Sequence, residues 1–223
     1  MIINEFKSII FDLDGTLVDS SESILESIQS AFLMCDLKPM MALNSDIIGP
    51  PLMETLIKLS GVSDKDVLNQ LAEKFKKNYD TFGFKKTKVF DGINEMLNEL
   101  NDNGFQLYIA TNKRDIPTKK IINYLGWDRL FKEIYSLDSF SPIALSKKDI
   151  LAKIIYNHSL LRKDVIYVGD LEDDRISAQA NNIRYIMVKW GYEKKEISED
   201  TINISSPKEL SIKLLKAKKM TTK

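Results

Sequence analysis

Short apolar segments, each followed by a polar turn and then a helical pattern, constrain the fold of this chain more than any other feature. They are rich in β-branched and aromatic residues, and they comprise Ser8–Phe11, Gln106–Ala110, Val165–Val168 and Tyr185–Val188. Continuous apolar strands are typical of a parallel sheet covered on both faces. Because these strands alternate with helical patterns, we predict an α/β fold with an open parallel sheet flanked by helices.

One long segment, from Ser20 to Phe84, interrupts this alternation because its pattern is helical throughout. Its apolar residues recur at helical spacing, and they are Ile24, Ile28 and Phe32, then Leu52, Leu56 and Leu59, then Val67, Leu68, Leu71 and Phe75. A structureless loop of this length would be unusual in a compact domain. We therefore predict a core domain made of residues 1–19 and 85–223 and a small helical domain made of residues 20–84.

Composition excludes several classes of function. The 32 Lys and Arg residues balance the 32 Asp and Glu residues, so no basic field is available to bind nucleic acid. A single cysteine and a single histidine exclude intrachain disulfides and multi-histidine metal sites. No segment approaches the ~20 apolar residues of a membrane span. We expect a cytoplasmic protein that binds neither nucleic acid nor membrane, and the sequence leaves open whether it is a monomer or a dimer.

Acidic and polar residues follow three of the expected strands. Asp12 and Asp14 come directly after the first strand, Thr111–Asn112 ends the second, and Gly169–Asp170 ends the third. An ordinary strand-ending turn would also explain two aspartates before a glycine. If the strands are parallel, however, all these side chains project from one carboxyl edge of the sheet, where open α/β folds bind their ligands.

A cluster of carboxylates at this edge requires a cation. Two carboxylates about 4 Å apart, at an effective dielectric constant of about 20, repel by roughly 4 kcal/mol, or about three pKa units. Oxygen ligands without cysteine or clustered histidine favour a hard ion such as Mg²⁺, which also binds substrate phosphate. Lys147 would add a positive charge for that phosphate, and Thr111 a hydrogen bond donor. Asp12 is then the candidate nucleophile, and Asp14 the candidate acid and base.

These motifs resemble those of the haloacid dehalogenase (HAD) superfamily of phosphohydrolases. The matching segments cover the chain from Lys7 to about Leu210, and they are Phe11–Ser20, Ala110–Lys113, Lys147 and Val168–Asp174. Ile48–Leu52 and Trp190–Tyr192 further resemble the phosphoglycolate phosphatase-like branch. The resemblance implies a Rossmann-like sheet with an inserted small α-helical cap domain that closes over the site.

The resemblance also implies roles for individual residues. Asp12 would be the nucleophile and Asp14 the acid and base, with Lys147 as the third catalytic residue. Thr111, Asn112 and Lys147 would bind the phosphate. Lys148 is the alternative to Lys147, because the family lysine is commonly followed by proline and here Lys147 is followed by a second lysine.

For the metal, the resemblance implies Mg²⁺ held by Asp12, Asp170 and the main-chain carbonyl of Asp14. Asp174 would lie just outside these ligands. Asp173 competes with it for this role, although the spacing of four residues from Asp170 favours Asp174.

The expected activity is Mg²⁺-dependent hydrolysis of a small phosphorylated metabolite through a phosphoaspartate on Asp12. A sugar phosphomutase similar to β-phosphoglucomutase would use the same aspartates. A receiver-like switch with a phosphorylated aspartate is less favoured, because receivers lack the helical insert. Lys113 and Arg114 could also contact phosphate, although a solvated helix start explains them as well.

Overall fold

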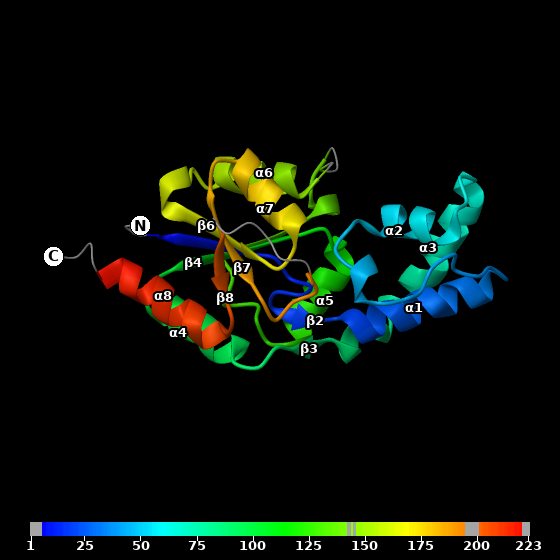
Figure 1. Ribbon diagram of the computed structural model, residues 1–223, viewed down its shortest axis with the longest axis horizontal. Helices are drawn as coiled ribbons and strands as arrows, with labels where there is room; N and C mark the ends of the chain where they lie inside the picture. The colour runs from blue at the N-terminus through cyan, green and yellow to red at the C-terminus, as the bar shows by residue number, and fades with distance from the viewer. Residues whose placement is uncertain (1–5, 142–143, 145, 195–200, 220–223) are drawn as a thin grey trace.

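A parallel sheet of six strands forms the centre of the larger part of the molecule in the computed structural model, which describes residues 6–141, 144, 146–194 and 201–219 (Figure 1). The strands lie in the order β5–β4–β1–β6–β7–β8, and every neighbouring pair is parallel. Their bounds are β1 Ser8–Phe11, β4 Gln106–Thr111, β5 Glu133–Ser136, β6 Val165–Gly169, β7 Arg184–Val188 and β8 Ile202–Ile204. The predicted α/β fold with an open parallel sheet is confirmed.

The two edge strands, β5 and β8, are absent from the sequence prediction. β5 begins with the exposed Glu133, and β8 has the exposed Asn203 at its centre. An edge strand has a neighbour on one side only and is less covered, so it lacks the continuous apolar run of the inner strands.

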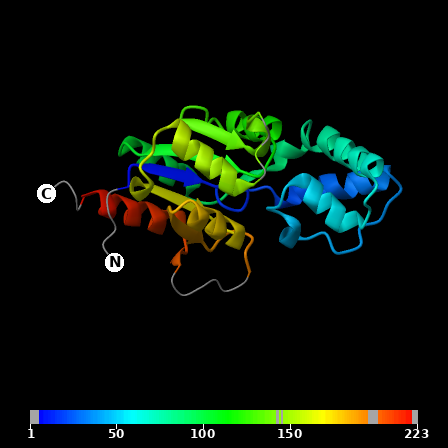
Figure 2. The same ribbon diagram turned by 90° about the horizontal axis from the view of Figure 1, so that it is seen from above.

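Helices cover both faces of the sheet (Figures 1 and 2). Alternate residues of β1 point to the two opposite faces of the sheet. Ile9 and Phe11 pack with α4, α5 and α8 on one face, whereas Ile10 packs with α6 and α7 on the other. The bounds of these helices are α4 Ile93–Asp102, α5 Asp115–Tyr124, α6 Lys147–Asn157, α7 Glu172–Ala180 and α8 Pro207–Lys219. None of the helices in the described part of the chain combines the length and the apolar character that a membrane crossing requires.

The helical segment of residues 20–84, here called the helical insert, lies beyond one end of the sheet (Figure 1). Its helices are α1 Ser21–Met34, α2 Leu52–Ser60 and α3 Lys65–Tyr79, with short 3₁₀ turns at Ser45–Ile47 and Gly83–Lys86. Phe32, Leu56 and Leu71 are buried in an apolar cluster formed mainly by the insert itself. The insert therefore has an apolar cluster that is mainly its own, joined by Ile121 of α5 and by Tyr192.

A short antiparallel ribbon joins the insert to the core. The chain leaves through β2 (Val18–Asp19) and returns through β3 (Lys88–Val89), and these two strands pair with each other. Two further 3₁₀ turns, Leu137–Ser139 and Arg162–Asp164, lie within the core.

The strand order places a ligand-binding crevice beside β1. From β1 the chain builds one half of the sheet through β4 and β5, and then the other half through β6, β7 and β8. Ligands of open α/β sheets bind where the strand order reverses, outside the carboxyl ends of the strands. Asp12, Thr111 and Asp170 all lie at this point of the fold.

The packing of α4 on the sheet yields a stability prediction. Leu97 is fully buried there, whereas the next residue, Asn98, is exposed. We expect Leu97→Ala to lower the free energy of unfolding by about 2–5 kcal/mol, because it removes buried methyl groups and leaves a cavity. Asn98→Ala should change it by no more than about 0.5 kcal/mol. Urea unfolding measures both values, and equal losses would contradict the assignment of Leu97 to the core.

Candidate active site

Asp12 lies at the carboxyl end of β1, directly between β4 and β6. Its main-chain N–H donates to the Val168 carbonyl at 2.9 Å, which extends the pairing of β1 with β6 by one residue. This pairing fixes the backbone from which the buried carboxylate projects. Lys147, the first residue of α6, places its Nζ 3.0 Å from Asp12 Oδ1.

Lys147 is enclosed between two carboxylates. Its side chain is 2% exposed, and its Nζ also lies 2.6 Å from Asp174 Oδ1. Burial by itself would lower the pKa of this ammonium group, but Asp12 and Asp174 raise it above its ordinary value. The neighbouring Lys148 is exposed. Of the two lysines considered from the sequence, the structure therefore brings Lys147 to Asp12.

Asp174 is held by donors from the protein. Besides Lys147, it accepts hydrogen bonds from the Tyr167 hydroxyl at 2.9 Å and from the Leu171 main-chain N–H at 3.1 Å. Asp173, the alternative from the sequence, is exposed. Because its oxygens are occupied in this way, Asp174 is suited to orient Lys147 beside Asp12.

Asp170 follows β6 and is packed between two glycines. Its carboxylate accepts hydrogen bonds from Thr16 Oγ1 at 3.2 Å and from the Tyr192 main-chain N–H at 2.7 Å. A Cβ added at Gly15, which has a φ of +86°, would lie 2.2 Å from Asp170 Oδ2. A Cβ at Gly191 would lie 2.3 Å from Asp170 Cβ. Only glycine fits at these two positions without displacing the carboxylate.

Asp12, Asp170 and Asp174 form the group that could hold a metal ion. Each offers a carboxylate oxygen, and these atoms all lie within 4.8 Å of one another. Three carboxylates and one ammonium group leave two negative charges uncompensated in a buried site. A divalent cation would balance that charge, and an all-oxygen donor set fits a hard ion such as Mg²⁺.

The pKa values of two of these acids reflect the crowding. Burial raises the pKa of Asp12 well above its ordinary value, Lys147 opposes the rise, and the charges of Asp174, Asp170 and Asp14 add to it. Burial and the charge of Asp174 raise the pKa of Asp170 to about 7. Without a cation, both groups therefore tend to hold a proton at pH values where an exposed aspartate is ionised.

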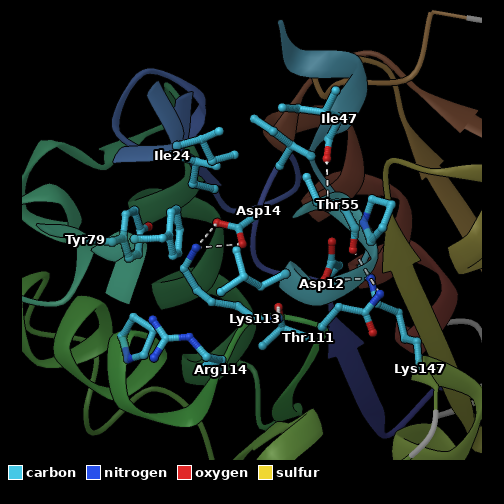
Figure 3. A pocket seen from close by; sticks show the side chains of 18 residues that line it. Asp12, Asp14, Ile24, Ile47, Thr55, Tyr79, Thr111, Lys113, Arg114 and Lys147 are labelled. Carbon is cyan, nitrogen blue, oxygen red and sulfur yellow. Dashed lines mark hydrogen bonds and ion pairs between the residues drawn. The ribbon is translucent and has the colours of Figure 1, made fainter. Parts of the chain in front are cut away.

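Asp14 lines the same cavity as Asp12 and is held by Ser20 and Lys113. Its carboxylate accepts a hydrogen bond from the Ser20 hydroxyl, and Lys113 Nζ lies 3.0 and 2.9 Å from its two oxygens (Figure 3). The same ammonium group lies 4.7 Å from the centre of the Tyr79 ring, on α3 of the insert. Burial acts to lower the pKa of Lys113, but the charge of Asp14 raises it above its ordinary value.

Thr111 and Asn112 line the same cavity from the end of β4. The Thr111 hydroxyl accepts a hydrogen bond from the Lys113 main-chain N–H at 3.1 Å. Asn112 Nδ2 donates to the Gly49 carbonyl of the insert at 3.0 Å, while its Oδ1 is buried without a hydrogen bond partner. Both residues are thus within the site, and Asn112 also joins the core to the insert.

The cavity lies between the sheet edge and the insert (Figure 3). The sheet side is polar, with Asp12, Asp14, Thr111 and Lys147. The arrangement therefore places two carboxyl groups and an ammonium group at one end of the cavity.

Of the two interpretations of Lys113 and Arg114, a phosphate contact and a solvated helix start, the structure does not support the second. Lys113 is 6% exposed, and Arg114 is 20% exposed and paired with Asp80 of the insert. The sequence draws attention to Lys113 and Arg114 because they directly follow Thr111–Asn112. Which carboxylates they pair with depends on how the insert folds back on the core.

Two further residues support the acids without having been assigned roles from the sequence. Ser20 donates its hydroxyl to Asp14, and its main-chain N–H donates to the Tyr192 hydroxyl at 3.0 Å. The Tyr192 hydroxyl in turn donates to Asp19 at 3.1 Å. Both residues lie within segments that resemble family motifs, and this resemblance is the sequence feature from which their roles could have been predicted.

The glycine beside Asp170 can be tested with a matched control. In Gly15→Ala the new methyl group would displace the Asp170 carboxylate, so we expect the stabilisation by Mg²⁺ to be lost. Gly126 has a similar φ of +69° but nothing within 4 Å of an added Cβ. Gly126→Ala should cost about 1–2 kcal/mol of backbone strain and keep the response to Mg²⁺. The measurement is the melting temperature with and without Mg²⁺, and an equal response in both variants would contradict the packing described.

Comparison with known proteins agrees with this geometry. A family model described as haloacid dehalogenase-like hydrolase matches residues 9–188. A 5′-nucleotidase of Pseudomonas aeruginosa is 30% identical over 206 residues, which span 91% of this chain and 89% of that protein. A phosphoglycolate phosphatase of Cereibacter sphaeroides is 28% identical over 189 residues, with 82% and 85% of the two chains covered.

Two further proteins resemble this chain, one relative that is named as a kinase and one protein of known structure. The tyrosine-protein kinase PtkA of Mycobacterium tuberculosis is 30% identical over 194 residues, which span 86% of this chain and 65% of that protein. The crystal structure of a phosphatase from Clostridium acetobutylicum, described there as predicted, has a TM-score of 0.84 and 27% identity, covering 96% of this chain and all of that one. The resemblance seen in the sequence motifs is confirmed, and the chain belongs to the haloacid dehalogenase-like hydrolase family.

Proposed function

We propose that this protein is a Mg²⁺-dependent phosphatase that hydrolyses a small phosphomonoester through a phosphoaspartate on Asp12. The observation that carries the proposal is the buried group of Asp12, Asp170, Asp174 and Lys147, which would carry two uncompensated negative charges if all three carboxylates were ionised. Asp14 lies two residues from Asp12 and lines the same cavity. Phosphatase names among the relatives agree with this reading.

Mg²⁺ would be held by Asp12 and Asp170, with the main-chain carbonyl of Asp14 as a further oxygen ligand. When bound, the ion would neutralise the carboxylates and the charge that develops on the phosphoryl oxygens. Side chains of the protein supply the remaining contacts to the phosphate. Lys147 neutralises part of the phosphate charge, and Thr111 and Asn112 offer hydrogen bonding groups at the end of β4.

In the first step, a carboxylate oxygen of Asp12 attacks the phosphorus atom of the substrate. The bond from phosphorus to the ester oxygen breaks, and Asp14 donates a proton to the leaving alcohol. In the second step, water attacks the phosphorus atom of the phosphoaspartate, Asp14 accepts the proton, and the bond to Asp12 breaks. Inorganic phosphate is released and Asp12 is regenerated. The insert would exclude bulk water while the first step occurs.

A sugar phosphomutase would begin with the same first step. It would return the phosphoryl group to a sugar instead of passing it to water. The two activities therefore differ only in the second step, and that step is the one that the experiment has to resolve. Net phosphate release supports the phosphatase, and rearrangement of a sugar phosphate without release supports the mutase.

Substitution of the nucleophile gives the most direct test. Asp12→Asn keeps the size of the side chain but removes the nucleophilic carboxylate, so we expect phosphate release from a metabolite panel to fall by at least about 10³-fold. Addition of EDTA to the wild-type protein should have a comparable effect. Asp138→Asn, which changes an aspartate of the core outside the cavity, serves as the control. Unchanged turnover after Asp12→Asn or EDTA would reject the mechanism.

The raised pKa of Asp170 yields a prediction about pH. Its pKa is about 7 in the folded protein, against about 3.9 in an unfolded chain, so between these values the folded state holds a proton that the unfolded state has lost. The stability of the metal-free protein should therefore decrease as the pH rises from about 4 to 7. At pH 5 protons compete with Mg²⁺ for Asp170, and at pH 8 they do not.

We accordingly expect Mg²⁺ to raise the melting temperature more at pH 8 than at pH 5. Differential scanning fluorimetry with Mg²⁺ and with EDTA at both pH values measures the difference. The same increase at both would contradict the role of Asp170 as a ligand.

A further inference from the structure

The wall that the helical insert contributes to the cavity is almost entirely apolar. Figure 3 shows Ile24 and Ile47 on this side of the space, opposite Thr111. The apolar lining from the insert includes Ile28, Leu52 and Phe75. Two polar side chains of the insert, Thr55 and Tyr79, line the cavity as well, and the Thr55 hydroxyl donates to main-chain carbonyls of the insert itself. Since Asp12 and Lys147 lie on the sheet side, the phosphate would occupy that side and the leaving group would face this wall.

The cations that line the cavity are already paired. Lys147 contacts Asp12 and Asp174, and Lys113 contacts both oxygens of Asp14. Arg114 binds Asp80 through two parallel contacts of 2.9 and 2.5 Å. Within the part of the chain that the structure describes, the lining thus includes no cation that lacks a carboxylate partner.

One polar group on the insert side is buried without a partner. Tyr79 is 1% exposed, and its hydroxyl makes no hydrogen bond of good geometry, although the Lys113 ammonium group lies 4.7 Å from the centre of its ring and interacts with it electrostatically. Its ring stacks on Phe75, with 5.4 Å between the centroids and an angle of 8° between the planes. A buried hydroxyl is normally satisfied, so this one is available to a polar atom of a ligand.

We propose that the leaving group is an uncharged alcohol that carries a flat, mainly apolar ring, the chemical class to which nucleosides belong. This inference rests on the proposed phosphatase function and assigns the substrate class of the same site. The apolar wall with the stacked Phe75 and Tyr79 accommodates the ring, and the Tyr79 hydroxyl hydrogen-bonds to a polar atom on it.

The same features disfavour a charged leaving group. The carboxylate of phosphoglycolate or the second phosphate of pyrophosphate would face aliphatic side chains, where an unpaired charge is costly. To gain a counterion, it would have to draw Lys113 from Asp14 or Arg114 from Asp80. Each exchange leaves another carboxylate, the buried Asp14 or the half-buried Asp80, without its partner.

Binding to a variant that cannot turn over tests the inference separately from catalysis. We would measure the affinity of Asp12→Asn, in the presence of Mg²⁺, for adenosine 5′-monophosphate and for phosphoglycolate by isothermal titration calorimetry. We expect the nucleotide to bind at least about tenfold more tightly. Equal or tighter binding of phosphoglycolate would overturn the inference.

Hydrolysis by the wild-type protein separates this inference from the proposed function. Release of phosphate from phosphoglycolate in preference to the nucleotide would overturn the substrate class and leave the phosphatase standing. No release from any phosphomonoester, together with tighter binding of the nucleotide by Asp12→Asn, would reject the phosphatase and keep the ligand class.

A second variant tests the hydrogen bond without altering the shape of the wall. Tyr79→Phe in the Asp12→Asn background removes only the unpartnered hydroxyl, so we expect the melting temperature to stay the same or rise. Affinity for adenosine 5′-monophosphate should fall at least about threefold, with affinity for phosphoglycolate unchanged. Tyr124→Phe, at an exposed tyrosine outside the cavity, should change neither. Equal effects on both ligands, or on neither, would contradict the role of the hydroxyl.

Discussion

Repulsion between buried carboxylates is the constraint on which the rest of this structure depends. Oxygens of Asp12, Asp170 and Asp174 lie within 4.8 Å of one another. At an effective dielectric constant of about 20, two charges at this distance repel by about 3–4 kcal/mol. Lys147 offsets only part of this, so the folded core must hold the acids together against it. The hydrogen bonds of β1 with β4 and β6 do so, because they fix the backbone at the ends of the strands.

Much of this arrangement could be predicted from the sequence. The inner strands are covered on both faces and therefore appear as continuous runs of β-branched and aromatic residues. Once these strands are taken as parallel, Asp12, Thr111 and Asp170 must lie at one edge, whatever the details of the loops. The position of Lys147 at the start of α6 follows similarly, since Ser146 accepts a hydrogen bond from the Asp149 main-chain N–H and begins the helix there.

What could not be predicted depends on contacts between distant parts of the chain. The edge strands β5 and β8 carry exposed residues and are defined by pairing with one neighbour, which a local pattern does not reveal. Lys113 follows a recognisable motif, but its pairing with Asp14 and its place over Tyr79 require the insert to fold back on the core. The engagement of Tyr192 with Ser20 joins residues 172 positions apart.

The paired strands β2 and β3 determine how the insert can move. Because the outgoing and returning segments are hydrogen-bonded to each other, neither can lengthen or shift independently of its partner. Sliding of the insert along the sheet would break the pairing of β2 with β3. Rotation of the insert about the long axis of this ribbon would preserve the pairing. A movement of the insert that opens the cavity and keeps β2 paired with β3 is therefore a rotation. It would have to separate Asn112 from Gly49 and Arg114 from Asp80, and it would uncover Ile121 of α5, which packs in the apolar cluster of the insert.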